Sequence, residues 1–245
     1  MDTNLKNIKD LEDAIQTAAH SNQPIFISYQ GLSKAVLMSH KGYETYMARM
    51  PGEQILKEMS DLEESYIKLL FSMTSVMDTH ESYLGGHTER VAILACDTAG
   101  GLGCTEDEIN DIRLAALLHD IGEIIIPIEI MQKTSPLTQD ELANIRQHPK
   151  TGADFIAPVK KMANIAEIIH SHHENYDGSG YPRGLKGEEI PLGGRIIGVV
   201  NTYDAITNVR LHRDARLHPQ AVAELEHGKG TTYDPKVVEA FLYLF

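Results

Sequence analysis

Two apolar segments of this chain end in histidines, and this pattern constrains the fold more than any other feature. The run AALL is followed directly by His119-Asp120, and IAEIIHS is followed by His172-His173 and the loop DGSGYP. An apolar run places the residues at its end in or beside the core, where an unpaired polar group costs several kcal/mol. We therefore expect helices whose ends converge, with their imidazoles and carboxylates satisfied by a bound metal ion.

Helical periodicity dominates the chain beyond Pro51-Gly52. Residues 53–77 form a long amphipathic stretch, and residues 87–100 and 162–173 repeat apolar positions at helical spacing. Thr105 and Thr138 each begin a capping-box pattern, with a glutamate three positions later, which predicts helix starts at residues 106 and 139. The second of these helices is expected to end at His148. The sequence therefore predicts a mainly α fold.

The first fifty residues differ from this pattern. Residues 5–18 predict an amphipathic helix, residues 25–38 predict two strands around Gln30-Gly31, and residues 40–50 predict a second helix. The wording QPIFISYQGLSKAVLMSHKGYETYM resembles the amino-terminal part of Phd/YefM-type antitoxins over about residues 6–50, which implies a dimerising unit. A plain α+β cap on the main domain is the alternative. We expect this unit over 1–50, a linking helix over 51–83 and the main helical domain over 84–245.

The charge balance limits the partners of the chain. Lys and Arg total 22 against 35 Asp and Glu, a net charge of −13, which argues against nonspecific binding to nucleic acid or anionic membranes. The polar start predicts no signal peptide, the apolar runs are too short to span a membrane, and the two cysteines form no CxxC motif. These observations predict a cytoplasmic protein that binds neither DNA nor membranes.

Several motifs resemble one family in order and spacing. They are HTERVA from His87, HDIGE from His119, HP from His148, HHENYDGSGYP from His172 and the final YDPKVVEAFL. From about Leu84 onward they resemble HD-GYP domains, all-helical HD-superfamily phosphodiesterases that hydrolyse cyclic di-GMP. The resemblance implies a cluster of two or three iron or manganese ions in a bundle of helices.

The resemblance also assigns roles to positions of this chain. The implied metal ligands are His87, His119, Asp120, His148, His172, His173 and Asn201. The implied substrate-binding residues are Gly180, Tyr181 and Pro182 in the loop, with Arg210 and Arg213 as phosphate-binding cations. We expect Asp120 and Glu123 to serve catalysis.

Three departures from the family pattern reduce what the resemblance implies. Glu123 replaces a lysine, Asn201 replaces a ligand aspartate, and Tyr83 stands where some members have a glutamate for a third ion. Two divalent ions, iron or manganese rather than zinc, are therefore expected. Glu123 is expected to supply the carboxylate that Asn201 lacks, with Asp204 as a weaker candidate.

Three hypotheses follow for the function. The first is an active cyclic di-GMP phosphodiesterase, and the second is a degenerate domain that binds metal or nucleotide and acts through partners without turnover. The third is a metal hydrolase of another phosphoester, because a fold does not fix a substrate. The retained GYP loop and the arginines favour the first hypothesis.

Overall fold

The structure is a computed structural model that describes residues 2–4, 17, 25–28, 34–37, 39, 52–81, 86–208 and 217–245. The chain divides into two compact units, Met1–Met77 and Asp78–Phe245, and each is described by itself. The domain boundaries predicted after residues 50 and 83 stay predictions.

The first unit contains a three-stranded sheet. β2 (Ile25–Ser28) and β3 (Lys34–Leu37) pair in antiparallel fashion, with Phe26 opposite Val36, which confirms the predicted pair of strands. β1 (Asp2–Asn4) pairs with β2 in parallel. It was not predicted, because three polar residues show no alternation. Apart from Thr17, which is helical, the helices predicted over 5–18 and 40–50 lie outside the described residues.

The described remainder of the chain is helical, which confirms the mainly α prediction. The long helix α3 spans Gly52–Glu81. The elements that follow are α4 (His87–Gly101), α5 (Glu106–Leu118), η1 (Ile121–Ile125), α6 (Ile128–Met131), α7 (Gln139–Ile145), α8 (His148–Ile156), η2 (Lys160–Met162), α9 (Ala163–Ser171), η3 (Gly187–Glu189), α10 (Leu192–Thr207), α11 (His218–His227) and α12 (Pro235–Leu242).

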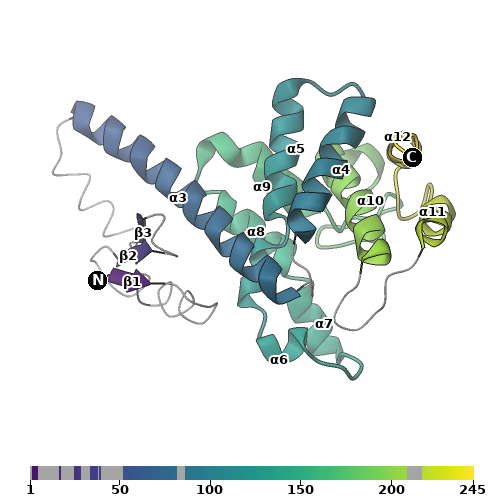
Figure 1. The fold of residues 1–245 in the computed structure, drawn as a ribbon, viewed down its shortest axis with the longest axis horizontal. Helices are drawn as coiled ribbons and strands as arrows, with labels where there is room; N and C mark the ends of the chain where they lie inside the picture. The colour runs from purple at the N-terminus through teal and green to yellow at the C-terminus, as the bar shows by residue number, and fades with distance from the viewer. Residues whose placement is uncertain are drawn as a thin grey trace. The chain divides into compact units, whose positions relative to one another are not determined.

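The core of the second unit lies between α4, α5, α9 and α10, which pack side by side (Figure 1). Small side chains let these helices approach closely: Ala95 and Ala99 on α4, and Ala115 and Ala116 on α5, are fully buried. Larger aliphatic side chains such as Ile169 and Ile197 fill the remaining space. This packing fixes where each helix ends.

Both predicted capping boxes are present. The Thr105 hydroxyl accepts from the amide of Glu108, whose carboxylate accepts from the amide of Thr105 at 2.8 Å. Thr138 and Glu141 repeat the arrangement at the start of α7. These exchanges satisfy amides that a helix start leaves without partners.

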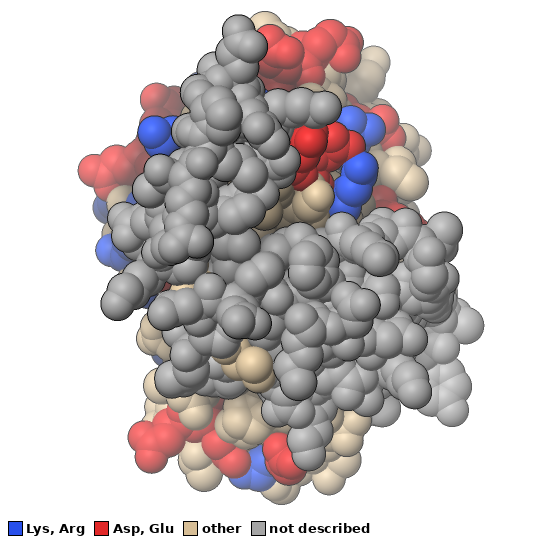
Figure 2. Space-filling view, turned by 90° about the vertical axis from the view of Figure 1, so that its left-hand side faces the viewer, with Lys and Arg blue, Asp and Glu red and all other residues tan. Residues whose placement is uncertain are grey.

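The described residues visible on one face of the molecule carry both acidic and basic side chains (Figure 2). On the face shown in Figure 2, acidic and basic side chains of the described residues are interspersed, and no continuous basic area is visible among them. Within the part of the chain that the structure describes, no helix combines the length and apolar character needed to cross a membrane.

Candidate metal centre

Four histidines from different helix ends surround the carboxylate of Asp120. Its Oδ2 lies 2.9 Å from His119 Nε2 and 3.8 Å from His87 Nε2. Its Oδ1 lies 3.4 Å from His148 Nε2 and 3.6 Å from His172 Nε2. The two oxygens of one side chain therefore face two different pairs of imidazoles.

The donor atoms form two groups that share Asp120. One group consists of His87, His119 and Asp120, and the other of Asp120, His148, His172 and His173. Within each group the donor atoms lie within 4.8 Å of one another. All six positions were predicted as ligands, and the structure brings all six together. The described residues thus contain a His/Asp cluster that could bind metal, and the carboxylate of Asp120 belongs to both donor groups.

Backbone contacts fix how three of the imidazoles are oriented. His119, His148 and His172 each place Nδ1 against the carbonyl oxygen three residues earlier in the chain, at 2.8, 2.8 and 2.6 Å. A carbonyl oxygen accepts only, so Nδ1 carries the hydrogen and Nε2 presents its lone pair to the centre. This is the tautomer that a metal ligand needs.

Because Nδ1 donates to a backbone carbonyl, each Nε2 is a hydrogen-bond acceptor that faces another acceptor. With Nδ1 protonated, the Nε2 lone pair of His119 points at the carboxylate of Asp120, and His148 Nε2 lies 3.2 Å from His172 Nε2. His119 Nε2 and Asn201 Oδ1 are buried without a hydrogen-bond partner among the described residues. Bound metal would supply the partner that these lone pairs lack. The residues present therefore fit a bound metal.

His87 is held by a carboxylate instead of a carbonyl. Its Nδ1 lies 2.7 Å from Asp204 Oδ2 on α10. Arg90, one turn further along α4, donates to both oxygens of Asp204, from Nε at 2.6 Å and from Nη2 at 3.0 Å. Asp204, the weaker ligand candidate, is thus an orienting partner of His87 in this arrangement.

A close approach of backbones places Asp120 beside His148. A Cβ on Gly122 would lie 2.0 Å from the carbonyl oxygen of His148 and 2.6 Å from the amide nitrogen of Gly152. Glycine therefore lets η1 lie directly against α8. The prediction that His148 ends a helix is wrong: it is the first residue of α8, because Pro149 suits the first turn of a new helix.

Burial and neighbouring charges set the protonation of the cluster. Burial lowers the pKa of His172 to about 4 and lowers the pKa of His173 well below its usual value. Burial also lowers the pKa of His87, but the nearby carboxylates of Asp120 and Asp204 outweigh this and raise that pKa to about 9. Burial would raise the pKa of Asp120, yet the surrounding histidines, His119 first, hold it well below its usual range.

The glycine-rich loop is fixed against the cluster by a buried carboxylate. Glu174 accepts hydrogen bonds from the amides of Arg183 at 2.7 Å and Leu185 at 3.0 Å. Glycine is required at 180, because a Cβ there would lie 2.1 Å from the amide nitrogen of Asn175. The loop thereby brings Tyr181 over the second donor group.

Tyr181 stacks on a donor. Its ring lies 4.9 Å from the ring of His173 at an interplanar angle of 20°. The guanidinium of Arg146 lies 5.4 Å from the centre of the Tyr181 ring. Burial raises the pKa of the Tyr181 hydroxyl to about 12, with Asp120 and Glu123 adding to the rise and Arg146 opposing it. Glu123 and Arg146 are thus both electrostatic neighbours of this hydroxyl.

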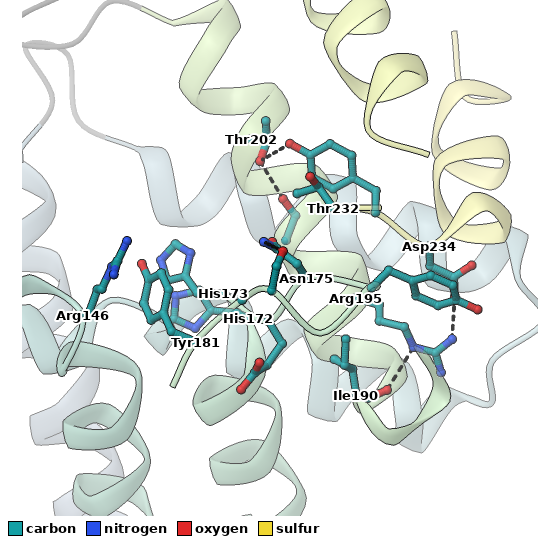
Figure 3. Close-up of a pocket in the computed structure, with 16 residues that line it drawn as sticks. Arg146, His172, His173, Asn175, Tyr181, Ile190, Arg195, Thr202, Thr232 and Asp234 are labelled. Carbon is teal, nitrogen blue, oxygen red and sulfur yellow. Dashed lines mark hydrogen bonds and ion pairs between the residues drawn. The ribbon is translucent and has the colours of Figure 1, made fainter. Parts of the chain in front are cut away.

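A cavity of about 260 Å³ extends from the cluster. His172 and His173 lie at one end, and Arg195 and Asp234 lie at the other (Figure 3). Arg195 donates to the carbonyl of Ile190 at 2.9 Å and pairs with Asp234. The charges of Arg195 and Asp234 at the far end of the cavity therefore neutralise each other.

The structure does not bring every predicted residue into the donor groups. Glu123 belongs to neither group. Asn201 lies on α10 midway between Gly198, which faces the His172 carbonyl, and Asp204, which contacts His87, so it is on the face turned to the cluster. Arg210 and Arg213 lie outside the described residues, as does Tyr83.

Sequence reasoning missed Arg146 and the orienting role of Glu174. Arg146 stands two positions before a predicted ligand, His148, and Glu174 stands directly after His173. Nearness in the sequence was the available signal. It does not tell which neighbours turn inward, because helix ends change the direction of the chain.

Comparisons with known proteins agree with this geometry. The model of the HD domain family matches residues 72–237. A cyclic di-GMP phosphodiesterase of Thermotoga maritima is 36% identical over 205 residues, 81% of this chain and 54% of that protein. A cyclic di-GMP phosphodiesterase response regulator of Xanthomonas campestris pv. campestris is 34% identical over 192 residues, 78% of this chain and 51% of that protein. The chain thus spans about half the length of these relatives.

Solved structures support the fold. A cyclic GMP-AMP-specific phosphodiesterase of V. cholerae matches with a TM-score of 0.57 and 23% identity, over 73% of this chain and 48% of that one. An HD-GYP-type protein of Bdellovibrio bacteriovorus matches with a TM-score of 0.55 and 19% identity, over 98% of this chain and 72% of that one. These comparisons do not support the resemblance of the N-terminal segment to antitoxins.

Proposed function

The chain belongs to the HD domain family, and from this membership we propose that it hydrolyses a phosphodiester bond of a cyclic dinucleotide, cyclic di-GMP, in a metal-dependent reaction. The observation that carries the proposal is the Asp120 carboxylate, whose two oxygens face separate groups of imidazoles. Relatives that are 34–36% identical are named cyclic di-GMP phosphodiesterases, which supports turnover over a purely binding role.

We infer that two ions, iron or manganese, would be held by His87, His119, Asp120, His148, His172 and His173, which include no thiolate. When bound, such a pair lowers the pKa of a water and stabilises the oxygens that gain charge during displacement. The protein's own part is to hold the Nε2 lone pairs in place through the carbonyl contacts and Asp204.

The loop supplies the substrate platform. Tyr181, fixed by Glu174 and stacked on His173, presents its ring and hydroxyl beside the donors. Gly180 and Pro182 shape the loop around it, and Arg210 and Arg213 are the proposed phosphate-binding cations. A platform of this kind orients the phosphodiester before any bond breaks.

Glu123 and Asn201 are expected to slow the reaction. Asn201 offers a neutral carbonyl oxygen in place of a carboxylate, so the second ion is held less firmly. Glu123 adds an anion near enough to the Tyr181 hydroxyl to help raise its pKa, and it would repel a phosphate bound nearby. Like charges about 4 Å apart repel by roughly 4 kcal/mol at an effective dielectric near 20.

The test measures metal content and turnover on the same anaerobically prepared sample. We expect stoichiometric metal in the wild type and little in Asp120→Ala, with Asp154→Ala, an exposed aspartate, as the control. Slow hydrolysis of cyclic di-GMP should accelerate in Asn201→Asp and Glu123→Lys, singly and together. Absence of metal with an unchanged Asp120→Ala would contradict the proposal, and restorations that both lower activity would show that the two residues belong to a working alternative site.

A related dinucleotide is the second candidate substrate. Three relatives from Vibrio cholerae, 29–34% identical, are named 3'3'-cGAMP-specific phosphodiesterases. Assaying both cyclic dinucleotides at equal concentration decides between them, because the ratio of kcat/KM values measures the discrimination directly.

A further inference from the structure

Arg146 places an unneutralised cation at the rim of the cluster. It follows α7 and is exposed, and its guanidinium lies 5.4 Å from the centre of the Tyr181 ring. Among the described residues its side chain makes no hydrogen bond and no ion pair. Cation–π contact with the ring holds the guanidinium in place without using its five N–H donors.

The other arginines near the cluster are already engaged. Arg195, which also lines the cavity, is paired with the buried carboxylate of Asp234 and with a carbonyl oxygen. Arg90 gives two hydrogen bonds to Asp204. Arg146 is therefore the described arginine at this site whose charge is available to an anionic ligand.

The ring of Tyr181 separates the guanidinium of Arg146 from the metal donor His173. Tyr181 lies between the guanidinium and His173, with ring-to-ring and ring-to-cation steps of 4.9 and 5.4 Å (Figure 3). A phosphate that faces the donor atoms is thus on the far side of Tyr181 from Arg146. The group that Arg146 contacts has to be a different one.

We propose that Arg146 binds the second phosphate of a substrate that carries two, while the scissile phosphate faces the metal donors. This inference rests on the proposed function and specifies it: the site selects ligands with a second anionic group at a fixed distance. A planar guanidinium held over the tyrosine ring offers two parallel N–H donors to such a phosphate.

Two substrates separate this role from a contact with the scissile group. Metal-loaded full-length enzyme is assayed with cyclic di-GMP, which has two phosphates, and with bis(p-nitrophenyl) phosphate, which has one. In Arg146→Gln we expect KM for cyclic di-GMP to rise about tenfold to a hundredfold, the usual effect of losing a charged hydrogen bond. KM and kcat for the single phosphodiester should stay unchanged, and Arg146→Lys should be intermediate because it keeps only the charge.

Arg113→Gln is the matched control, since it removes the same charge from an exposed position on α5. Equal KM values for cyclic di-GMP in the two glutamine variants would overturn the proposal. So would an equal loss with both substrates, because that result places Arg146 on the scissile phosphate.

Calorimetric titration with cyclic di-GMP distinguishes this inference from the proposed function. A wild type that binds but does not hydrolyse cyclic di-GMP, with at least tenfold weaker binding in Arg146→Gln, would remove the proposed activity and retain the role of Arg146. A wild type that neither binds nor hydrolyses it would overturn both.

Discussion

Asp120 is surrounded by histidines, which affect whether it can act as a metal ligand or as a catalytic group, the two roles predicted for it. The neighbouring histidines hold its pKa well below the usual range, so the carboxylate stays ionised. A group that transfers protons works best with a pKa near the working pH, whereas a ligand needs a permanent negative charge. The low pKa therefore fits Asp120 as a metal ligand better than as a group that transfers protons.

His87 should make the metal-free protein depend on pH. Its pKa rises from 6.5 to about 9 on folding, so below pH 6.5 both the folded and the unfolded chain carry the proton and the full stabilisation is present. Between pH 6.5 and 9 only the folded protein keeps it, and the stabilisation is lost as pH rises through 9. The free energy of unfolding should decrease by about 3 kcal/mol over this interval from this group alone.

Chemical denaturation in the presence of a chelator measures this effect. His87→Gln removes the titrating group, so its unfolding free energy should change less between pH 6.5 and 9 than that of the wild type. Parallel curves for the two proteins would show that His87 does not keep its proton in the folded state.

At single positions, the sequence predicted residues that belong to recognisable motifs. It missed contacts that depend on how distant segments are oriented in the fold. The six cluster donors were predicted through the resemblance of their motifs to one family, and the structure brings them together. Arg146 was not predicted, because its contact with Tyr181 joins the turn between α7 and α8 to the glycine-rich loop, which is far away in the sequence. The contact of Asp204 with His87 spans 117 positions and leaves no local signature.

Among the elements, helix starts were more predictable than helix ends. A capping box is a local exchange of hydrogen bonds, so Thr105 and Thr138 mark their helices in any context. The end of α7 depends on how η1 and α8 meet, a contact that involves Gly122 and the His148 carbonyl. Tertiary contacts of this kind are invisible to periodicity.

Gly122→Ala tests the contact between η1 and α8. The new Cβ would overlap the His148 carbonyl, so one element has to shift, which costs about 1–3 kcal/mol of stability. Because Asp120 directly precedes η1 and His148 is the first residue of α8, the shift should also weaken metal binding. Denaturation and elemental analysis of the same preparation measure both effects.

Gly100→Ala is the control for this substitution. Gly100 is in α4, and a Cβ at this position would meet nothing within 4 Å, so alanine should stabilise the helix by up to about 1 kcal/mol. Equal stability and equal metal content in the two variants would mean that the η1–α8 contact is not tight in solution.

On the scale of the whole molecule, we expect the first unit to dimerise and the second unit to bind metal. All cluster donors lie in Asp78–Phe245, and the small sheet lies in Met1–Met77. A sheet of three short strands leaves edges that a second copy can cover. A chain that starts at Gln54 should therefore become monomeric in light scattering while it keeps its metal.

The same oligomeric state for the shortened and full-length chains would count against this division. Duplex DNA provides the second measurement: the net charge of −13 and the mixed surface in Figure 2 give little electrostatic hold on a duplex. Tight, salt-sensitive binding of the full-length chain to DNA would overturn that expectation.

The donors that share Asp120 belong to helix ends spread over residues 87–173, so bound metal would join segments that are far apart in the chain. Metal that binds only the folded arrangement of donors stabilises it by mass action, and a ligand present at about a thousand times its dissociation constant adds about 4 kcal/mol to folding stability. In a cell short of metal, the protein would then be less stable as well as inactive. Proteases remove loosened proteins first, so the amount of this protein would follow the metal supply.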